Sequence, residues 1–243
     1  SPAWGRCSRF VHRKKCGLPP EIAVTTDLSL PSEPLLVAAQ QAAMARLRDA
    51  ICRGGVAVLC GPAGSGKTML LTRLASEQAA VTGRPSGPYP LRQLVDNPDN
   101  GPQRVALIDD AHAAVDAAQL RRVVDSIERL TTSTAVVLAG EGRLLTLLMR
   151  QPDLEQRVRL RAVLPAWSES ESVSLITSAL PAMMARAEGP RLASRMHELA
   201  AGIPRQLVRL IDTVGMVLAA EPGHDLSVDD LETFHRRLFL QAA

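Results

Sequence analysis

Apolar positions in the first part of the chain switch between helical spacing and short unbroken runs. Residues 33–53 carry apolar side chains every three or four positions, which predicts one face of an amphipathic helix: Leu36, Ala39, Ala43, Leu47 and Ile51. A short apolar run with glycines on both sides follows at residues 56–60 and is typical of a buried strand. Residues 68–82 return to helical spacing. From residue 33 onward the pattern therefore predicts a helix, a strand, a glycine-rich loop and a second helix, in that order.

The same alternation continues after an irregular stretch. Residues 83–103 are dense in Pro, Gly, Asn and Asp and predict a long surface connection, with at most a short helix at 91–95. Buried strands are predicted at 105–108 and 135–139, with a helix at 119–130 between them. Because strands and helices alternate, we expect a mainly parallel sheet covered by helices.

Beyond Pro165 the pattern is helical throughout. Asp230 follows Ser227 by three positions, which is a capping arrangement for the last helix of this region. Its four candidate helices cover residues 169–180, 191–200, 204–220 and 228–240. We therefore predict three regions, an extended basic arm at 1–34, an α/β core at 35–165 and a helical lid at 166–243.

Composition narrows the class of protein without revealing its partner. Aromatic residues are only 2% of the chain, so the core must be built from aliphatic side chains. A net charge of +3 is too ordinary to predict nucleic-acid binding by itself. The four cysteines form no CxxC pair and are read as reduced thiols. No run approaches the roughly 20 apolar residues that a membrane-spanning helix needs, so we expect a soluble, cytoplasmic protein.

The strongest chemical signal lies between the first predicted strand and the following helix. Residues 61–68 match the phosphate-binding pattern G-x-x-x-x-G-K-[ST] in full. Glycines let successive N–H groups turn toward one anion, and the helix dipole adds positive potential there. We expect Lys67 to bridge the β and γ phosphates of a nucleotide. The predicted nucleotide-binding residues are Gly61, Pro62, Ala63, Gly64, Ser65, Gly66, Lys67, Thr68 and Met69.

Two adjacent carboxylates at the end of the second predicted strand supply the other half of such a site. Asp109 is placed to hold Mg²⁺ together with the hydroxyl of Thr68, and Asp110 is placed to orient or deprotonate the attacking water. The alternative is a pair of solvated acids at a strand end. We predict a P-loop NTPase that uses ATP and Mg²⁺.

Four motifs in this order resemble AAA+ ATPases of the general secretion pathway protein A (ExeA-like) type, over roughly residues 17–220. They are the P-loop, the Asp109-Asp110-Ala-His112 run, Gln156-Arg157-Val158 and Gly202-Ile-Pro-Arg205. The resemblance implies a three-layer AAA+ core with a helical lid, ATP with Mg²⁺ and homo-oligomers with the site at a subunit boundary. It also implies a protein partner in a secretion or cell-envelope complex, and hence a peripheral position at the inner membrane as an alternative to a free cytoplasmic one.

The resemblance also assigns three further site residues. Glu141 falls where the family has a polar sensor of the γ phosphate, and its alternative is an ordinary loop carboxylate. Arg157 is the first candidate for an arginine that reaches a neighbouring subunit's nucleotide, ahead of Arg159 and Arg161, with a solvated basic helix face as the alternative. Arg205, at the start of a lid helix, resembles the sensor arginine that reports the nucleotide state to the lid.

Two departures from the family pattern leave other functions open. The family more often has Glu at the position of Asp110, and a shorter side chain lies further from the water, so hydrolysis is expected to be slow. The span between Lys67 and Asp109 is short, and the sheet is expected to lack a strand or to have its edge covered by the Pro-rich loop. The rival hypotheses are a DNA-associated ATPase of the transposition-helper or initiator kind and a nucleotide-binding scaffold with little hydrolysis.

Overall fold

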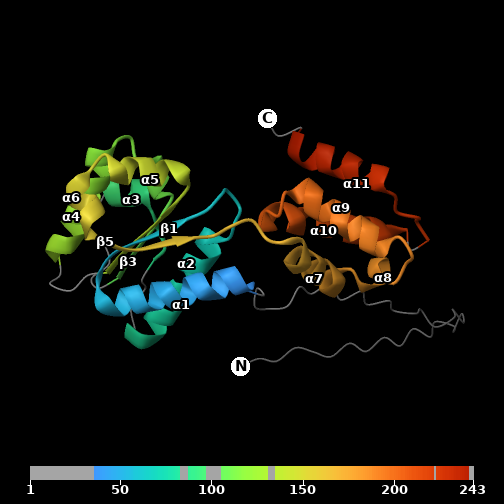
Figure 1. Ribbon diagram of the computed structural model, residues 1–243, viewed down its shortest axis with the longest axis horizontal. Helices are drawn as coiled ribbons and strands as arrows, with labels where there is room; N and C mark the ends of the chain where they lie inside the picture. The colour runs from blue at the N-terminus through green and yellow to red at the C-terminus, as the bar shows by residue number, and fades with distance from the viewer. Residues whose placement is uncertain (1–35, 83–86, 97–104, 131–134, 222, 241–243) are drawn as a thin grey trace, which may run out of the picture.

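A computed structural model describes residues 36–82, 87–96, 105–130, 135–221 and 223–240. Its first half is a sheet between two layers of helices, and its second half is helical (Figure 1). The structure confirms the predicted α/β class and the mainly parallel sheet. The predicted basic arm at 1–34 lies outside the described residues.

Five parallel strands form the sheet in the order β2-β3-β4-β1-β5 within the part of the chain described. β1 thus lies inside the sheet, between β4 and β5, and its end carries the glycine-rich loop. The strands are β1 Gly55–Cys60, β2 Tyr89–Pro90, β3 Val105–Asp109, β4 Ala135–Gly140 and β5 Val158–Val163.

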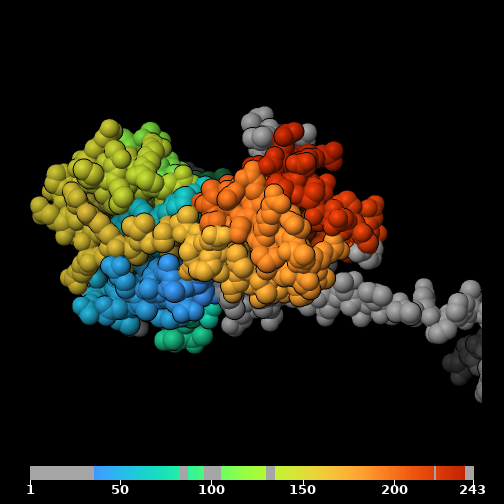
Figure 2. All heavy atoms as spheres, turned by 45° about the vertical axis from the view of Figure 1, so that its right-hand side comes forward, coloured from blue at the N-terminus to red at the C-terminus, as the bar shows by residue number. Residues whose placement is uncertain are grey.

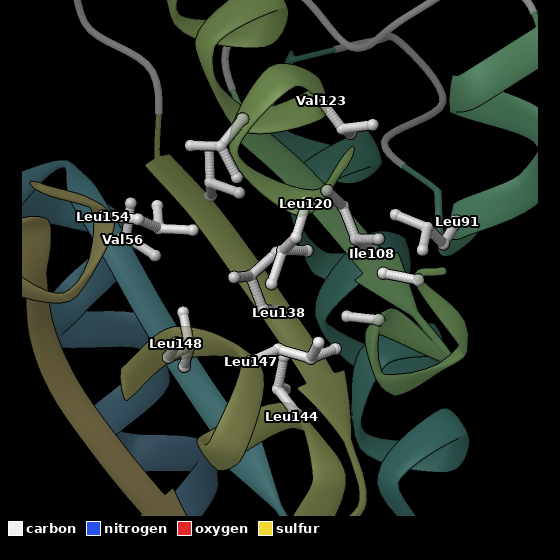
Figure 3. Close-up of a cluster of buried hydrophobic side chains, with 14 of the residues drawn as sticks. Val56, Leu91, Ile108, Leu120, Val123, Leu138, Leu144, Leu147, Leu148 and Leu154 are labelled. Carbon is white, nitrogen blue, oxygen red and sulfur yellow. The ribbon is translucent and has the colours of Figure 1, made fainter. Parts of the chain in front are cut away.

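Alternate residues of each inner strand face opposite helical layers, which explains the unbroken apolar runs. Val56 and Val58 pack with helices α3 to α6 on one face, the cluster drawn in Figure 3. Ala57 and Leu59 pack with α1 and α2 on the other face. The helices are α1 Ala38–Arg53, α2 Lys67–Thr82, α3 Leu91–Asp96, α4 Ala117–Leu130, α5 Gly142–Met149 and α6 Pro152–Arg157.

The structure rules out two of the alternatives that the sequence left open for this sheet. The short span before Asp109 does not remove a strand, because the two-residue β2 and the six-residue α3 fit within it. β2 lies at the sheet edge and ends in Pro90, a residue that edge strands tolerate. The segment with Arg159 and Arg161 is the edge strand β5, so the alternative of a basic helix face does not apply to these two arginines.

The helices after β5 enclose a separate aliphatic core, which includes Ile176, Leu192, Leu207 and Leu231. Figure 2 shows them as a lobe beside the sheet-containing part. They are α7 Glu169–Ala179, α8 Pro181–Met184, α9 Gly189–Ala200, α10 Pro204–Ala220 and α11 Val228–His235, with a π-helical turn at Arg236–Leu240. This arrangement agrees with a helical lid, while the predicted boundary at residue 165 stays a prediction.

Candidate functional site

The glycine-rich loop joins β1 to α2 at the carboxyl edge of the sheet. Gly64 and Gly66 have φ values of +79° and +98°, a region that residues with a Cβ rarely adopt. These angles let the chain fold back, and the Ser65 N–H donates to the carbonyl of Pro62 at 3.2 Å. The loop is therefore the curled backbone that the sequence motif predicts.

Lys67 stands at the first residue of α2 and reaches back across the loop. It is only 7% exposed, and its Nζ donates to the carbonyl oxygens of Gly61 and Pro62, both at 2.9 Å. An ammonium has three N–H donors, so one remains for a further acceptor. The cation is thus held beside the loop by the loop's own carbonyls.

The hydroxyl of Thr68 and the carboxylate of Asp109 lie next to each other, as the predicted metal site requires. Thr68 Oγ1 donates to Asp109 Oδ2 at 2.6 Å, which joins the start of α2 to the end of β3. The other oxygen, Oδ1, accepts the backbone N–H of Asp110 at 2.9 Å. Asp109 is 8% exposed, so its carboxylate is held in a fixed orientation.

Asp110 occupies a distinct backbone conformation immediately after β3. Its φ of 52° is in the left-handed region, where Asp is more readily accepted than most residues. The turn continues as a 3-10 helix, η2 Ala111–Ala113, closed by the Ala113 N–H donating to the carbonyl of Asp110 at 2.8 Å. The side chain of Asp110 is exposed and, among the described residues, takes part in no side-chain hydrogen bond or ion pair. It is free to contact a bound molecule.

The residues present fit a phosphate group and an accompanying Mg²⁺. Ser65 Oγ is buried without a hydrogen-bond partner among the described residues, beside the glycine cradle. No group of three or more His, Cys, Asp or Glu side chains placed to hold a metal occurs in the described part of the chain. Mg²⁺ commonly takes one or two protein ligands and completes its shell with water and phosphate oxygens. Thr68 and Asp109 suit that arrangement.

The Gly202-Ile-Pro-Arg205 motif brings the helical lobe onto the loop. Gly202 has a φ of +65°, and a Cβ there would lie 2.5 Å from the carbonyl oxygen of Trp167. Pro204 starts α10, and the Arg205 N–H donates to the carbonyl of Gly64 at 3.3 Å. The exposed Arg205 side chain is therefore anchored by its backbone at the loop.

Glu141 follows β4 at the same sheet edge. Its carboxylate is 42% exposed and lies 3.9 Å from Nε2 of His112, whose Nδ1 is buried without a partner among the described residues. The guanidinium of Arg143 donates to the carbonyls of His112, Ala114 and Val115 at 2.9 to 3.2 Å. Arg143 thereby ties α5 to the turn that follows Asp110, a contact that the sequence reasoning missed.

Arg157 lies away from the loop, at the end of α6, and is engaged within its own chain. Its guanidinium binds Glu128 at 2.5 Å and Asp125 at 2.7 Å, both on α4. Burial tends to lower the pKa of Arg157, but these two carboxylates outweigh it and the pKa is raised. Arg161 binds Glu155 at 2.8 Å. The structure does not bring these arginines together with Lys67 and Asp109 in the same chain.

Two residues with contacts at this edge of the sheet had no place in the predicted site: Gln40, which bonds the glycine-rich loop, and Arg143, which bonds the turn after Asp110. Gln40 is polar but only 2% exposed, and its side chain donates to the backbone carbonyl of Ser65 in the loop. The available signal was its position three residues before Ala43 and seven before Leu47, on the inward face of the predicted helix.

Solved structures of other proteins share this fold. A single-residue variant of RuvB from Thermotoga maritima has a TM-score of 0.57 and 22% identity, covering 82% of this chain and 68% of its own. The ADP form of ORC2 from Aeropyrum pernix has a TM-score of 0.56 and 17% identity, covering 86% and 71%. Aeropyrum pernix ORC1 in complex with DNA has a TM-score of 0.60 and 15% identity, covering 87% and 68%.

The chain has an AAA+ P-loop fold. At these identities the similarity establishes the fold alone. The AAA+ likeness predicted from the motifs is thus confirmed at the level of the fold, and the narrower likeness to general secretion pathway protein A is not. Comparison of the sequence with protein-family models and with curated proteins finds no match. None of the described helices is both long enough and apolar enough to cross a bilayer.

Proposed function

We propose that this AAA+ chain binds ATP with Mg²⁺ at the glycine-rich loop and hydrolyses it. The observation that carries the proposal is the placement of Thr68 2.6 Å from Asp109, beside a loop that holds Lys67. A hydroxyl and an ammonium at the start of α2, with a carboxylate at the end of β3, form the set of groups that phosphoryl transfer to water requires. The ADP-bound ORC2 structure supports a nucleotide as the ligand of this fold.

The chain's own residues divide the work as follows. The N–H groups of the loop and the free donor of Lys67 would contact phosphate oxygens and stabilise their charge. Thr68 and Asp109 would hold Mg²⁺, which when bound neutralises charge on the transferring phosphate. Asp110 would accept a hydrogen bond from the attacking water and take its proton.

Arg205 and Glu141 are proposed to sense the nucleotide. Arg205 enters α10 directly from the contact with Gly64, so a shift of the loop would be transmitted to the helical lobe. Glu141 lies at the end of β4, next to the strand that carries the loop. Its negative charge would repel a phosphate, and the ring of His112 lies 3.9 Å from it.

Arg157 is proposed to act on the nucleotide of a neighbouring subunit in a homo-oligomer. In this chain it is held by Asp125 and Glu128, so that role would require the guanidinium to leave at least one carboxylate. The proposal therefore predicts that turnover per molecule rises with protein concentration, because the complete site forms only between subunits.

The test is phosphate release from ATP and Mg²⁺ across a range of protein concentrations. Wild type should release phosphate, whereas Asp110→Asn should bind ATP and release at least about a hundredfold less, since the amide is a far weaker base. Asp212→Asn is the matched control. Asp212 is exposed on α10 and, within the described residues, takes part in no side-chain hydrogen bond or ion pair, so its substitution should leave turnover unchanged. Equal turnover in wild type and Asp110→Asn would contradict the assigned role.

We further propose that turnover drives or regulates a secretion or cell-envelope assembly, an idea supported by the motif likeness to general secretion pathway protein A. Isolation of a nucleotide-dependent complex with envelope proteins would support it. A DNA-associated role is the second candidate, favoured by the likeness to ORC1 in its complex with DNA. Salt-dependent binding to duplex DNA would select that candidate, and no binding at low salt would remove it.

A nucleotide-binding scaffold is the third reading, motivated by the short side chain of Asp110. Tight ATP binding without phosphate release at any protein concentration would select it. Lys67→Ala would then still abolish binding, because the loop serves the same purpose in both cases.

A further inference from the structure

The side-chain amide of Gln40 connects helix α1 to the backbone of the glycine-rich loop. Its Nε2 donates to the carbonyl oxygen of Ser65 at 3.2 Å, and its Oε1 accepts the backbone N–H of Val37 at 3.3 Å. We propose that Gln40 is a positioning residue for the loop, one that holds the Ser65–Gly66 peptide in the orientation needed to bind a polyphosphate. The inference deepens the proposed ATP site and rests on it.

Gln40 is a polar side chain buried on the inward face of α1, where apolar residues are expected. It is 2% exposed and lies among Ala43, Met44 and Leu47 on the inward face of α1. A buried amide is unfavourable unless both of its ends are hydrogen-bonded, and here both ends are. An apolar side chain would have completed the packing of α1, so what the amide adds is its two directed hydrogen bonds.

The two bonds have separate consequences. The bond from Val37 is a helix cap, because Gln at the third helical position satisfies the N–H at the start of α1. The bond to Ser65 is a long-range contact across 25 positions, and it is the one that reaches the loop. A substitution that removes the second bond therefore tests the role in the loop, provided that it adds no charge there.

The geometry at Gly66 explains why this bond matters to a ligand. A Cβ on Gly66 would lie 2.8 Å from Nε2 of Gln40, so the amide covers one side of this residue at close range. Because the Ser65 carbonyl belongs to the peptide unit whose N–H is that of Gly66, fixing the carbonyl also fixes the direction of that N–H. A peptide unit free to rotate would present its carbonyl to the phosphate in part of the population.

The inference predicts weaker binding of any ligand that uses the loop through phosphate alone. Loss of one buried hydrogen bond corresponds to about a tenfold change in affinity. Inorganic tripolyphosphate contacts the phosphate cradle and has no base or ribose, so it is the sharpest probe. ATP and tripolyphosphate should lose affinity by the same factor, because the defect lies in the part of the site that they share.

The experiment compares wild type with three variants of α1. Gln40→Glu keeps an acceptor for Val37 and loses the donor to Ser65, but it adds a negative charge beside the loop. Gln40→Met loses both bonds, fills a similar volume and adds no charge, so it is the decisive variant. Gln41→Met is the matched control, since Gln41 is exposed and, within the described residues, its side chain donates to the carbonyl of Leu36 at 2.8 Å and not to the loop. Dissociation constants for ATP and tripolyphosphate are measured by calorimetry, and the folded state is checked by thermal unfolding without ligand.

The expected result is about a tenfold rise of both dissociation constants in Gln40→Glu and Gln40→Met, with Gln41→Met unchanged. Wild-type affinity for tripolyphosphate in both Gln40 variants would overturn the inference and leave the proposed function intact. An equal loss in Gln41→Met would also overturn it, because the effect would then belong to α1 as a whole. Failure of wild type to bind either ligand would overturn the proposed function and this inference with it.

Discussion

Replacing Arg157 with Ala removes a cation that joins α6 to α4. Its side chain is 31% exposed and binds Asp125 and Glu128, whose side chains are 25% and 30% exposed. Exposed ion pairs contribute about 0.2 to 1 kcal/mol, and breaking a fully buried one costs about 3 to 5 kcal/mol. The two contacts of Arg157 are half-buried, so their contribution should lie between the values for exposed and fully buried pairs. We expect a loss of about 2 kcal/mol in the free energy of unfolding.

The expected loss of about 2 kcal/mol includes repulsion between Asp125 and Glu128, which Arg157 neutralises in wild type. Asp125 and Glu128 are three positions apart on α4, and like charges at that spacing destabilise a helix when no cation lies between them. Arg121 retains a contact with Asp125 at 3.5 Å and offsets part of this repulsion. In a chain of this size, about 2 kcal/mol corresponds to a melting temperature lower by roughly 4 to 8 °C.

The assay is thermal and urea unfolding of wild type, Arg157→Ala and Arg150→Ala. Arg150 is the matched control because it is exposed, lies seven positions away and makes no ion pair with any residue in the described part of the chain. It should change the unfolding free energy by less than about 0.5 kcal/mol. A melting temperature for Arg157→Ala equal to that of wild type would refute the argument that the contacts with α4 are structural.

Three further outcomes follow from the structure. Gly64→Ala should lower ATP affinity at least tenfold in a binding titration, because the residue has a φ of +79° at the loop and resists a Cβ; wild-type affinity would contradict this. Ser227→Ala should lower the free energy of unfolding by about 1 kcal/mol at neutral pH, since it removes the cap of α11. Hydrogen bonds from Ser227 lower the pKa of Asp230, so the part of this stabilisation that comes from the hydroxyl–carboxylate bond is present above the unfolded pKa, near 4, and is lost as the pH falls through the lower folded value. A deficit equal at pH 7 and pH 3 would argue against it. Peptide mapping after alkylation should find Cys52 modified before Cys60, because Cys52 is exposed whereas burial raises the pKa of the Cys60 thiol; the reverse order would be inconsistent with these positions.

The inner strands and the loop could be predicted from the sequence because their signals are local. The run at β1 is apolar on both faces and ends in a complete phosphate-binding pattern. Residues 61–68 can therefore be recognised as a phosphate-binding loop without information from the rest of the chain. Thr68 and Asp109 were paired by the motif order, and the fold brings them within 2.6 Å. Parallel strands make this possible, since their carboxyl ends meet at one edge.

The two edge strands escaped prediction for different physical reasons. β5 alternates exposed arginines with partly or fully buried Leu160 and Ala162, a period of two that is obscured by the charged residues of α6 before it. β2 is two residues long and contains Pro90, so it has no periodicity to detect. Both depend on their neighbours in the sheet, which is information that a local pattern does not contain.

The site contacts that were missed are all formed across long sequence separations. Gln40 and Ser65 are 25 positions apart, and Arg143 reaches His112 across 31. The placement of Arg205 against Gly64 joins the helical lobe to the loop and depends on the left-handed backbone of Gly202. Helical spacing places Gln40 on an inward face, but only the fold reveals what it meets there.

The most direct test of the central claim is phosphate release from ATP and Mg²⁺ by wild type and by Lys67→Ala. Both are measured at the same protein concentration, chosen high enough that the turnover per molecule of wild type no longer rises with concentration. Thr72→Ala serves as the control, because the exposed Thr72 hydroxyl donates, within the described part of the chain, to the carbonyl of Thr68 on its own helix at 2.8 Å. The account predicts turnover in wild type and Thr72→Ala and none in Lys67→Ala, with a cooperative thermal unfolding transition showing that all three are folded. Equal turnover in wild type and Lys67→Ala would contradict it.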